Sequence, residues 1–134
     1  MKRMLLGGAL AMALAAPAFA ADPATGVWRT EPGNEGGYLF VRIEECGKLI
    51  CGTIVGAVDS EGKKDPEYEH LGKPIIKGMK PDGDGRYSGG TIWAPDDDKT
   101  YSSKMRLKSP KVLEVSGCVL GGLFCRSQDW TRVK

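Results

Sequence analysis

Histidine is almost absent from this sequence: the 134 residues include one, His70. A Ser/His/acid triad would have to be built around it, and none of the serines that we considered as its partner stands in a nucleophile-elbow context. These serines are Ser60, Ser88, Ser102 and Ser103. A metal site based on imidazole needs more than one histidine. The sequence therefore predicts a protein that is not an enzyme and holds no metal or cofactor, with His70 as an exposed residue of a charged loop.

Long apolar runs are scarce as well, and the one that is present lies near the N-terminus. Residues 4–16 are apolar but shorter than the roughly 20 residues that a membrane-spanning helix needs. Lys2 and Arg3 precede the run, and Ala18-Phe19-Ala20 follows as a small-x-small cleavage site. This order is typical of a secretory signal peptide over residues 1–20. We expect a secreted or periplasmic chain without a transmembrane segment, whose mature part, residues 21–134, is a single domain.

The mature chain also lacks net charge. Lys2 and Arg3 leave with the leader, so the 19 basic residues fall to 17, which equals the number of acidic residues. A protein that binds nucleic acid needs a basic field to neutralise phosphates. The sequence therefore argues against a nucleic-acid partner.

No helical period is sustained along the mature chain, and short alternating runs separated by Gly, Pro and Asp take its place. Strands are predicted over residues 25–31, 38–46, 51–58, 74–79, 86–93, 100–108, 112–119 and 124–133. The long, charged connection 59–73 is expected to hold a short helical turn at 66–71. Gly89-Gly90 predicts a bulge or sharp bend inside a strand, which is how a barrel turns a corner. The fold predicted is all-β: a small antiparallel up-and-down β-barrel of about eight strands with one long charged loop.

Four cysteines fit an oxidising compartment. They allow three connectivities, and the local one, Cys46 with Cys51 and Cys118 with Cys125, needs no assumption about distant strands. A zinc site of four thiolates is the competing interpretation, although the six-residue gap between Cys118 and Cys125 exceeds the usual ligand spacing.

The last strand has an unusual face. Phe124, Arg126, Gln128, Trp130 and Arg132 alternate onto one side of it. If that side is buried, both arginines and the glutamine need hydrogen-bond partners. Either the face points outward and is solvated, or Arg126 and Gln128 point into a lumen and hold a polar group of a ligand. An eight-stranded barrel is wide enough for one small ligand or for a filled core.

Several short motifs in a fixed order carry a family resemblance. They are Gly26-Val27-Trp28, Cys46-Gly47 with residues 49–52, Gly89-Gly90-Thr91-Ile92 with Pro95, Lys99-Thr100-Tyr101, Gln128, and Trp130-Thr131-Arg132. The order resembles the bacterial secreted family called domain of unknown function 2147, over essentially the whole mature chain. The resemblance implies a lipocalin-like (calycin) barrel. It also implies a structural clasp in which Arg132 packs on Trp28, with Trp130 beside them.

Two functional hypotheses lead. In the first, the barrel binds a small apolar or amphipathic molecule, lined by Leu39, Val41, Tyr101, Met105 and Val115, with Arg126 and Gln128 as polar contacts. In the second, a filled barrel is an envelope module that binds a protein or glycan through exposed aromatic residues such as Tyr38, Tyr87 and Trp93. Enzymatic activity is the remaining alternative. A continuous lumen above about 300 Å³ would favour the first hypothesis, because ligand pockets usually start at that size.

Overall fold

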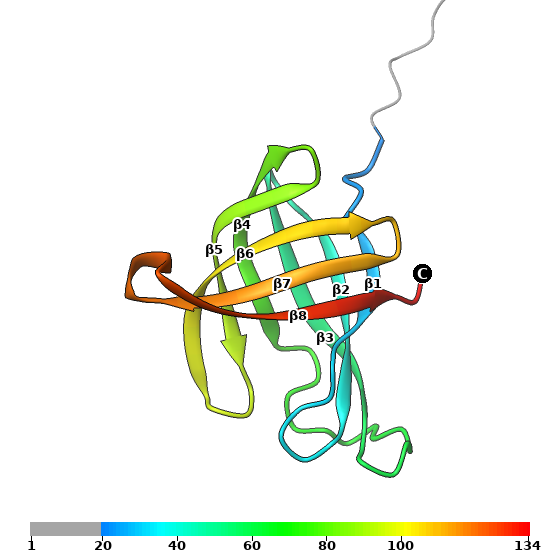
Figure 1. Ribbon diagram of the computed structural model, residues 1–134. Helices are drawn as coiled ribbons and strands as arrows, with labels where there is room; N and C mark the ends of the chain where they lie inside the picture. The colour runs from blue at the N-terminus through cyan, green and yellow to red at the C-terminus, as the bar shows by residue number, and fades with distance from the viewer. Residues whose placement is uncertain (1–19) are drawn as a thin grey trace, which may run out of the picture.

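The computed structural model describes residues 20–134, so the predicted signal peptide lies, except for Ala20, outside the described residues. Eight antiparallel strands follow one another around a closed barrel (Figure 1). They are β1 (Gly26–Arg29), β2 (Tyr38–Cys46), β3 (Leu49–Val58), β4 (Pro74–Gly83), β5 (Arg86–Ala94), β6 (Lys99–Ser109), β7 (Val112–Val119) and β8 (Phe124–Arg132). A single turn of 3-10 helix, η1 (Leu120–Gly122), joins β7 to β8. The predicted all-β, eight-stranded up-and-down barrel is confirmed.

The barrel is closed by a short contact between its first and last strands. β1 has four residues, and it pairs with β8 only at Trp28 with Arg132 and at Arg29 with Thr131. The Arg132 N–H bonds to the Lys111 carbonyl on the β7 side. Backbone groups alternate sides along a strand, so those of the odd-numbered β8 residues point toward the seam with β1. Most of β8 therefore presents a strand edge that no neighbouring strand covers.

Gly89-Gly90 forms an irregularity inside β5, as the sequence predicts. The β5–β6 register shifts between Tyr87 and Gly90. Gly89 has φ = 78°, in the left-handed region, and a Cβ on Gly90 would meet the backbone of Lys77 and Met79. Only glycine allows the two strands to approach so closely.

Two local predictions are wrong. β4 continues to Gly83, beyond its predicted end at residue 79, so the connection to β5 is only Asp84-Gly85, both with positive φ (55° and 73°). Residues 66–71 contain no helical turn. Single hydrogen bonds, Tyr68 N–H to Asp65 O and Leu71 N–H to Tyr68 O, form separate reverse turns there that carry the segment back across the barrel.

The two ends of the barrel differ. The turns β2–β3, β4–β5 and β6–β7 lie at the closed end, and the connections 30–37, 59–73, 95–98 and η1 lie at the open end. The hydrophobic core fills the closed half, and its largest fully buried side chains are Trp28, Trp130, Ile43, Ile50, Ile54, Ile76, Met79, Leu113 and Val41. At 20–33 cal/mol per Å² of buried apolar surface, this packing is the main source of stability.

The segment before β1 seals the closed end. Ala24 is fully buried, and its carbonyl accepts a hydrogen bond from Trp28 Nε1 at 2.9 Å. The Tyr87 hydroxyl donates to Asp22 Oδ1 at 2.5 Å. Burial, helped by the neighbouring Asp22 carboxylate, raises the pKa of Tyr87 well above its ordinary value. Tyr87 is thus a core residue, and the prediction that it is an exposed aromatic is wrong.

Candidate functional site

The open half of the barrel is hollow. It encloses a cavity of about 1150 Å³, which opens to solvent between the loops of the open end. The apolar side chains of its floor come from five strands: Leu39, Ile75, Ile92, Val115 and Trp130. Inward-facing positions near the closed end fill the core, and those nearer the open end line the cavity. The volume is slightly above the roughly 300–1,000 Å³ that is typical of small-molecule pockets.

One wall of the cavity is an aromatic stack held by the 59–73 connection. The His70 ring meets Tyr68 and Trp93 edge to face, at centroid distances of 5.2 and 4.9 Å. The His70 side chain is 19% exposed, and its Nδ1 is buried without a hydrogen-bond partner among the described residues. His70 is therefore not the exposed loop residue predicted from its charged neighbours, because the loop folds back onto Trp93.

The mouth of the cavity carries tyrosines beside carboxylates. The Tyr101 hydroxyl donates to Asp97 Oδ2 at 3.1 Å, and this bond raises the pKa of Tyr101. Burial, followed by the charges of Asp96, Glu69 and Asp65, raises the pKa of Tyr68. Both phenols stay protonated at neutral pH. The Tyr101 proton is used by Asp97, so Tyr101 offers a ligand only its ring and the lone pairs of its hydroxyl oxygen.

β8 forms the wall next to the seam. Arg126 and Gln128 line the cavity and are exposed, because β1 ends before it reaches them. Gln128 Oε1 accepts hydrogen bonds from Trp130 Nε1 (2.9 Å) and from the Glu31 N–H (3.3 Å). Each of the two interpretations of this face is therefore partly right. Arg126 and Gln128 point into the lumen, and they are exposed to solvent there.

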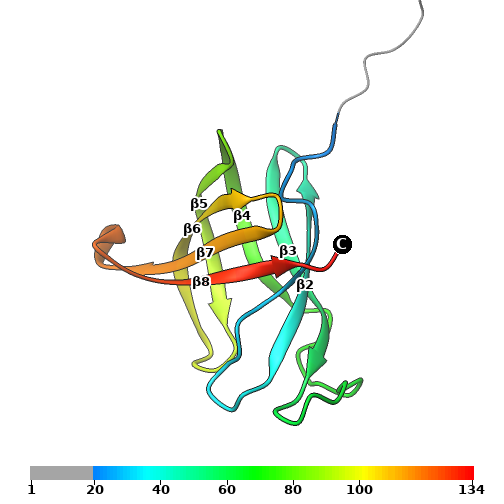
Figure 2. The same ribbon diagram turned by 45° about the vertical axis from the view of Figure 1, so that its right-hand side comes forward.

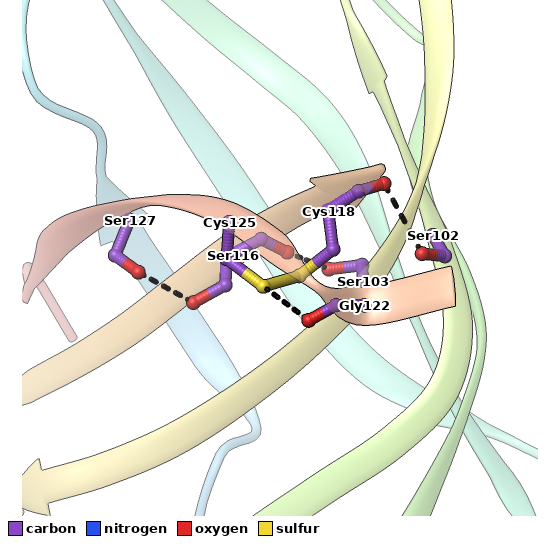
Figure 3. The surroundings of a disulfide bond; sticks show 7 residues. All are labelled: Ser102, Ser103, Ser116, Cys118, Gly122, Cys125 and Ser127. Carbon is purple, nitrogen blue, oxygen red and sulfur yellow. Dashed lines mark hydrogen bonds between the residues drawn. A yellow bond between two sulfur atoms is a disulfide. The ribbon is translucent and has the colours of Figure 1, made fainter. Parts of the chain in front are cut away.

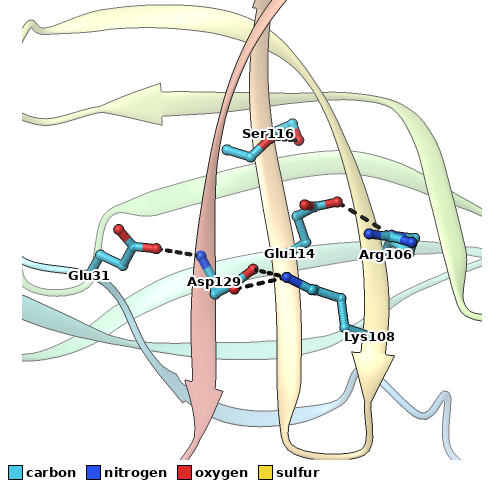
Figure 4. Close-up of polar contacts among 7 residues, drawn as sticks. Glu31, Arg106, Lys108, Glu114, Ser116 and Asp129 are labelled. Carbon is cyan, nitrogen blue, oxygen red and sulfur yellow. Dashed lines mark hydrogen bonds and ion pairs between the residues drawn. The ribbon is translucent and has the colours of Figure 1, made fainter.

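Glu31 bridges the seam. Its Oε2 accepts a hydrogen bond from the Asp129 N–H at 2.7 Å, which satisfies a backbone donor on the uncovered edge of β8 (Figure 4). On the outer face nearby, Lys108 pairs with Asp129 at 2.9 Å and Arg106 with Glu114 at 3.4 Å. A side chain therefore holds the barrel together where strand pairing stops.

The structure brings five of the seven predicted ligand-binding residues to the cavity: Leu39, Tyr101, Val115, Arg126 and Gln128. Val41 and Met105 do not line it. Both point inward, but they lie deeper, in the filled core, with 0% and 3% of their surface exposed. Alternation along a strand gives the face of a residue, not its depth in the barrel.

Sequence reasoning missed the wall residues Tyr68, His70 and Trp93, and also the carboxylates at the mouth. A signal for them exists. In an up-and-down meander every second connection lies at the same end, so the loops 30–37, 59–73 and 95–98 had to meet. Each loop taken alone gives no such signal.

The clasp lies at the closed end, away from the cavity mouth. The Arg132 guanidinium carbon is 4.4 Å from the centroid of the Trp28 ring. Its nitrogens donate to the carbonyls of Pro110 (2.8 Å), Thr25 (2.8 Å) and Pro23 (2.6 Å). Arg132 thus ties together the β6–β7 turn, the N-terminal segment and β8.

The cysteines form two local disulfides, Cys46–Cys51 and Cys118–Cys125. Cys118 and Cys125 stand directly opposite each other on β7 and β8, with Cα atoms 4.1 Å apart, as in a non-hydrogen-bonded antiparallel pair (Figure 3). Beyond them the hairpin projects past the rest of the barrel (Figures 1 and 2). Its tip exposes Val119, Leu120, Leu123 and Phe124, by 43, 72, 73 and 61%. We call residues 119–124 the finger; Val119 and Phe124 also line the cavity.

Within residues 20–134 no helix has the length and apolar character needed to cross a membrane. Over the same residues, no three His, Cys, Asp or Glu side chains are placed to hold a metal ion.

Comparisons with known proteins give a family and a structure of similar fold. The bacterial family described as "Uncharacterized protein conserved in bacteria (DUF2147)" matches residues 26–132. No curated protein matches the chain. Among solved structures, the chain is similar to "Protein HP1028 from the human pathogen Helicobacter pylori", which is said to belong to the lipocalin family. The two are 18% identical, with a TM-score of 0.66 over 86% of this chain and 85% of the other.

Proposed function

Since this chain belongs to the uncharacterised bacterial family DUF2147 and has a lipocalin-like barrel, we propose that it is a secreted or periplasmic protein that binds one small amphipathic molecule. The observation that carries the proposal is the cavity of about 1150 Å³ in the open half of the barrel. An apolar floor below a polar mouth suits a ligand with an apolar body and a polar head. Two disulfides among the described residues support an oxidising compartment.

The filled-barrel alternative finds less support. It needs side chains that occupy the barrel along its whole length, whereas only the closed half is packed. Of the three aromatic residues named for it, Tyr87 is buried, and Tyr38 and Trp93 are half-buried and line the cavity. We likewise propose binding, not catalysis, as the role of the site.

Native mass spectrometry of protein purified gently from its own host tests the proposal. We expect an adduct of small-molecule mass that disappears on denaturation. A fluorescence titration with the uncharged probe Nile red tests binding directly. Bare protein in several preparations, together with no probe binding, would contradict the proposal.

A pair of variants localises the binding. Ile92→Trp fills the floor of the cavity, and we expect it to weaken Nile red binding by at least tenfold. Val55→Trp adds the same side chain at a position that is 39% exposed and does not line the cavity, so it should leave binding unchanged. Equal effects of the two variants would place the probe elsewhere.

A further inference from the structure

The cavity differs from the rest of the protein in its charge. The whole chain has a formal net charge of +2. Among the described residues that line the cavity, seven are acidic and one, Arg126, is a permanent cation. About two-fifths of the 17 acidic residues of the chain thus surround one opening.

Three loops of the open end supply these carboxylates. The 30–37 loop and the 95–98 turn contribute Glu31, Glu35, Asp96 and Asp97. The 59–73 connection contributes Asp59, Asp65 and Glu69. The loops approach the opening from different strands, so the charges surround it.

Backbone hydrogen bonds hold several of these side chains in place. Asp96 Oδ2 accepts the Asn34 N–H at 2.9 Å, which links two of the loops. Asp59 Oδ1 accepts the N–H groups of Glu61 and Lys63, both at 2.9 Å. N–H donors orient a carboxylate but do not cancel its charge.

Ion pairs balance little of this charge, and Arg29 and Lys73 lie instead over the rings of Tyr38 and Trp93, at 4.1 and 5.6 Å from the ring centroids. Within residues 20–134, the one ion pair that a carboxylate of this set forms is that of Glu69 with His70, at 3.9 Å, which counts only when the histidine is protonated. The lysines that form ion pairs do so elsewhere, as Lys63 does with Glu61. A cleft lined by one sign of charge, with low-dielectric walls, concentrates ions of the opposite sign.

The interior of the site is apolar and aromatic. Ile75, Ile92 and Val115 supply apolar lining, and Tyr68 and Tyr101 supply phenol rings near the carboxylates, where Tyr101 donates to Asp97. Burial raises the pKa of Tyr68, and the nearby carboxylates of Asp96, Glu69 and Asp65 raise it further. Aromatic rings bordered by carboxylates favour organic cations, through cation–π attraction and charge together.

From this arrangement we infer that the ligand of the cavity is an amphipathic cation, with its apolar body on the floor and an ammonium or amidinium head between the carboxylates of the mouth. The inference rests on the proposed function and adds the sign of the ligand's charge. An anionic ligand is the opposite prediction, and its head group would pair with the Arg126 guanidinium.

Three fluorescent probes with one apolar body test the inference. Each is a dansyl amide with a short alkyl chain that ends in an ammonium (dansylcadaverine), a carboxylate or a methyl group. We expect the ammonium probe to bind at least tenfold more tightly than the other two at low salt. Its affinity should fall several-fold between about 20 and 500 mM NaCl, because added salt screens exposed charges.

Charge-neutralising variants provide the second test. The double variant Glu35→Gln/Glu69→Gln should weaken binding of the ammonium probe by roughly fivefold. This corresponds to about 1 kcal/mol for charges near a solvated surface. Arg126→Gln should strengthen binding of the ammonium probe, because the variant removes a cation that repels the ammonium head. Glu61→Gln, which removes an acid outside the cavity, is the matched control and should have no effect.

The outcomes separate the two proposals. If the carboxylate or methyl probe binds as tightly as the ammonium probe, or if Arg126→Gln weakens the ammonium probe, the cation inference is wrong and a binding cavity remains. If none of the three probes binds and Nile red also fails, the proposed function falls with it.

Discussion

Arg132 supports the barrel through several bonds at once, and its loss should be felt in stability. The Arg132→Ala variant loses the stacking on Trp28 and leaves three carbonyls without their donor. We expect the free energy of unfolding to fall by about 2 to 3 kcal/mol, measured by urea denaturation.

Binding separates this clasp role from a role in ligand contact. The cavity lies at the other end of the barrel, so folded Arg132→Ala should bind Nile red with unchanged affinity. Arg132→Lys keeps the charge but cannot reach all three carbonyls. Its free energy of unfolding should therefore lie between those of the wild type and Arg132→Ala. A folded Arg132→Ala variant with greatly weakened binding would contradict the clasp.

Gly26 lies next to the Arg132 side chain and leaves no room for a Cβ atom. It has φ = 138°, and a Cβ there would collide with the Lys134 carbonyl oxygen and with Nη1 of Arg132. We expect Gly26→Ala to cost more than about 2 kcal/mol, because it adds a clash to the backbone strain. Gly47→Ala is the control: its φ is also positive, but the space around it is empty. Equal urea midpoints for the two variants would contradict the clash.

Tyr87 predicts a loss of stability in alkali. Its pKa is raised in the folded protein above the ordinary value of 10.0, so the folded state holds the phenolic proton more tightly than the unfolded state does. Its contribution is therefore complete below pH 10 and is lost as the pH rises from there toward the folded-state pKa. Urea midpoints at pH 8 and 10.5 should differ more for the wild type than for Tyr87→Phe. An identical difference in both proteins would exclude Tyr87 as the cause.

For individual residues, the sequence predicts well which side of a strand a side chain occupies. It predicts poorly which residues surround that side chain in the fold. Leu39 and Val115 were placed correctly because alternation alone decides which side of a strand they occupy. Val41 and Met105 were misplaced because depth along the barrel depends on how far the core extends. His70 was misplaced because its burial depends on a loop returning to Trp93, which no local pattern reports.

At the scale of elements, the β7–β8 hairpin depends on its disulfide. The finger extends beyond the barrel with exposed apolar side chains, and so has little packing to order it. Replacing Cys118 and Cys125 by Ser removes a cross-link worth about 2 kcal/mol by loop-closure entropy. We expect amide hydrogen exchange to accelerate over residues 116–127, with slow exchange retained in β2 and β3. A comparable acceleration in the Cys46/Cys51 double variant would show a general effect instead.

The strands themselves were largely predictable. β2 and β7 begin and end where alternation begins and ends, at Tyr38 and Cys46 and at Val112 and Val119. β4 was predicted too short because Pro81, Asp82 and Gly83 favour turns in isolation, whereas pairing with β5 keeps them extended. Tertiary pairing overrides local propensity there.

At the scale of the whole molecule, the cavity arises from how the two ends of the barrel are filled. Large inward side chains and the N-terminal segment occupy the closed half, while the core does not extend into the open half and the four-residue β1 leaves that half hollow. No single segment of the sequence predicts that one half of the barrel is filled and the other hollow. The order of the strands does record which loops meet, and this explains how acidic residues far apart in the chain surround one opening.

The bridge made by Glu31 has a consequence for how copies of this protein behave toward one another. An uncovered strand edge invites pairing with a strand of another molecule, and a charged side chain laid across it discourages that pairing. Glu31→Ala removes both the charge and the acceptor of the Asp129 N–H. We expect this variant to self-associate at concentrations where the wild type does not, as measured by light scattering, whereas Glu35→Ala should not. The Glu31 carboxylate at the seam is thus expected to hinder strand pairing between two copies of the barrel.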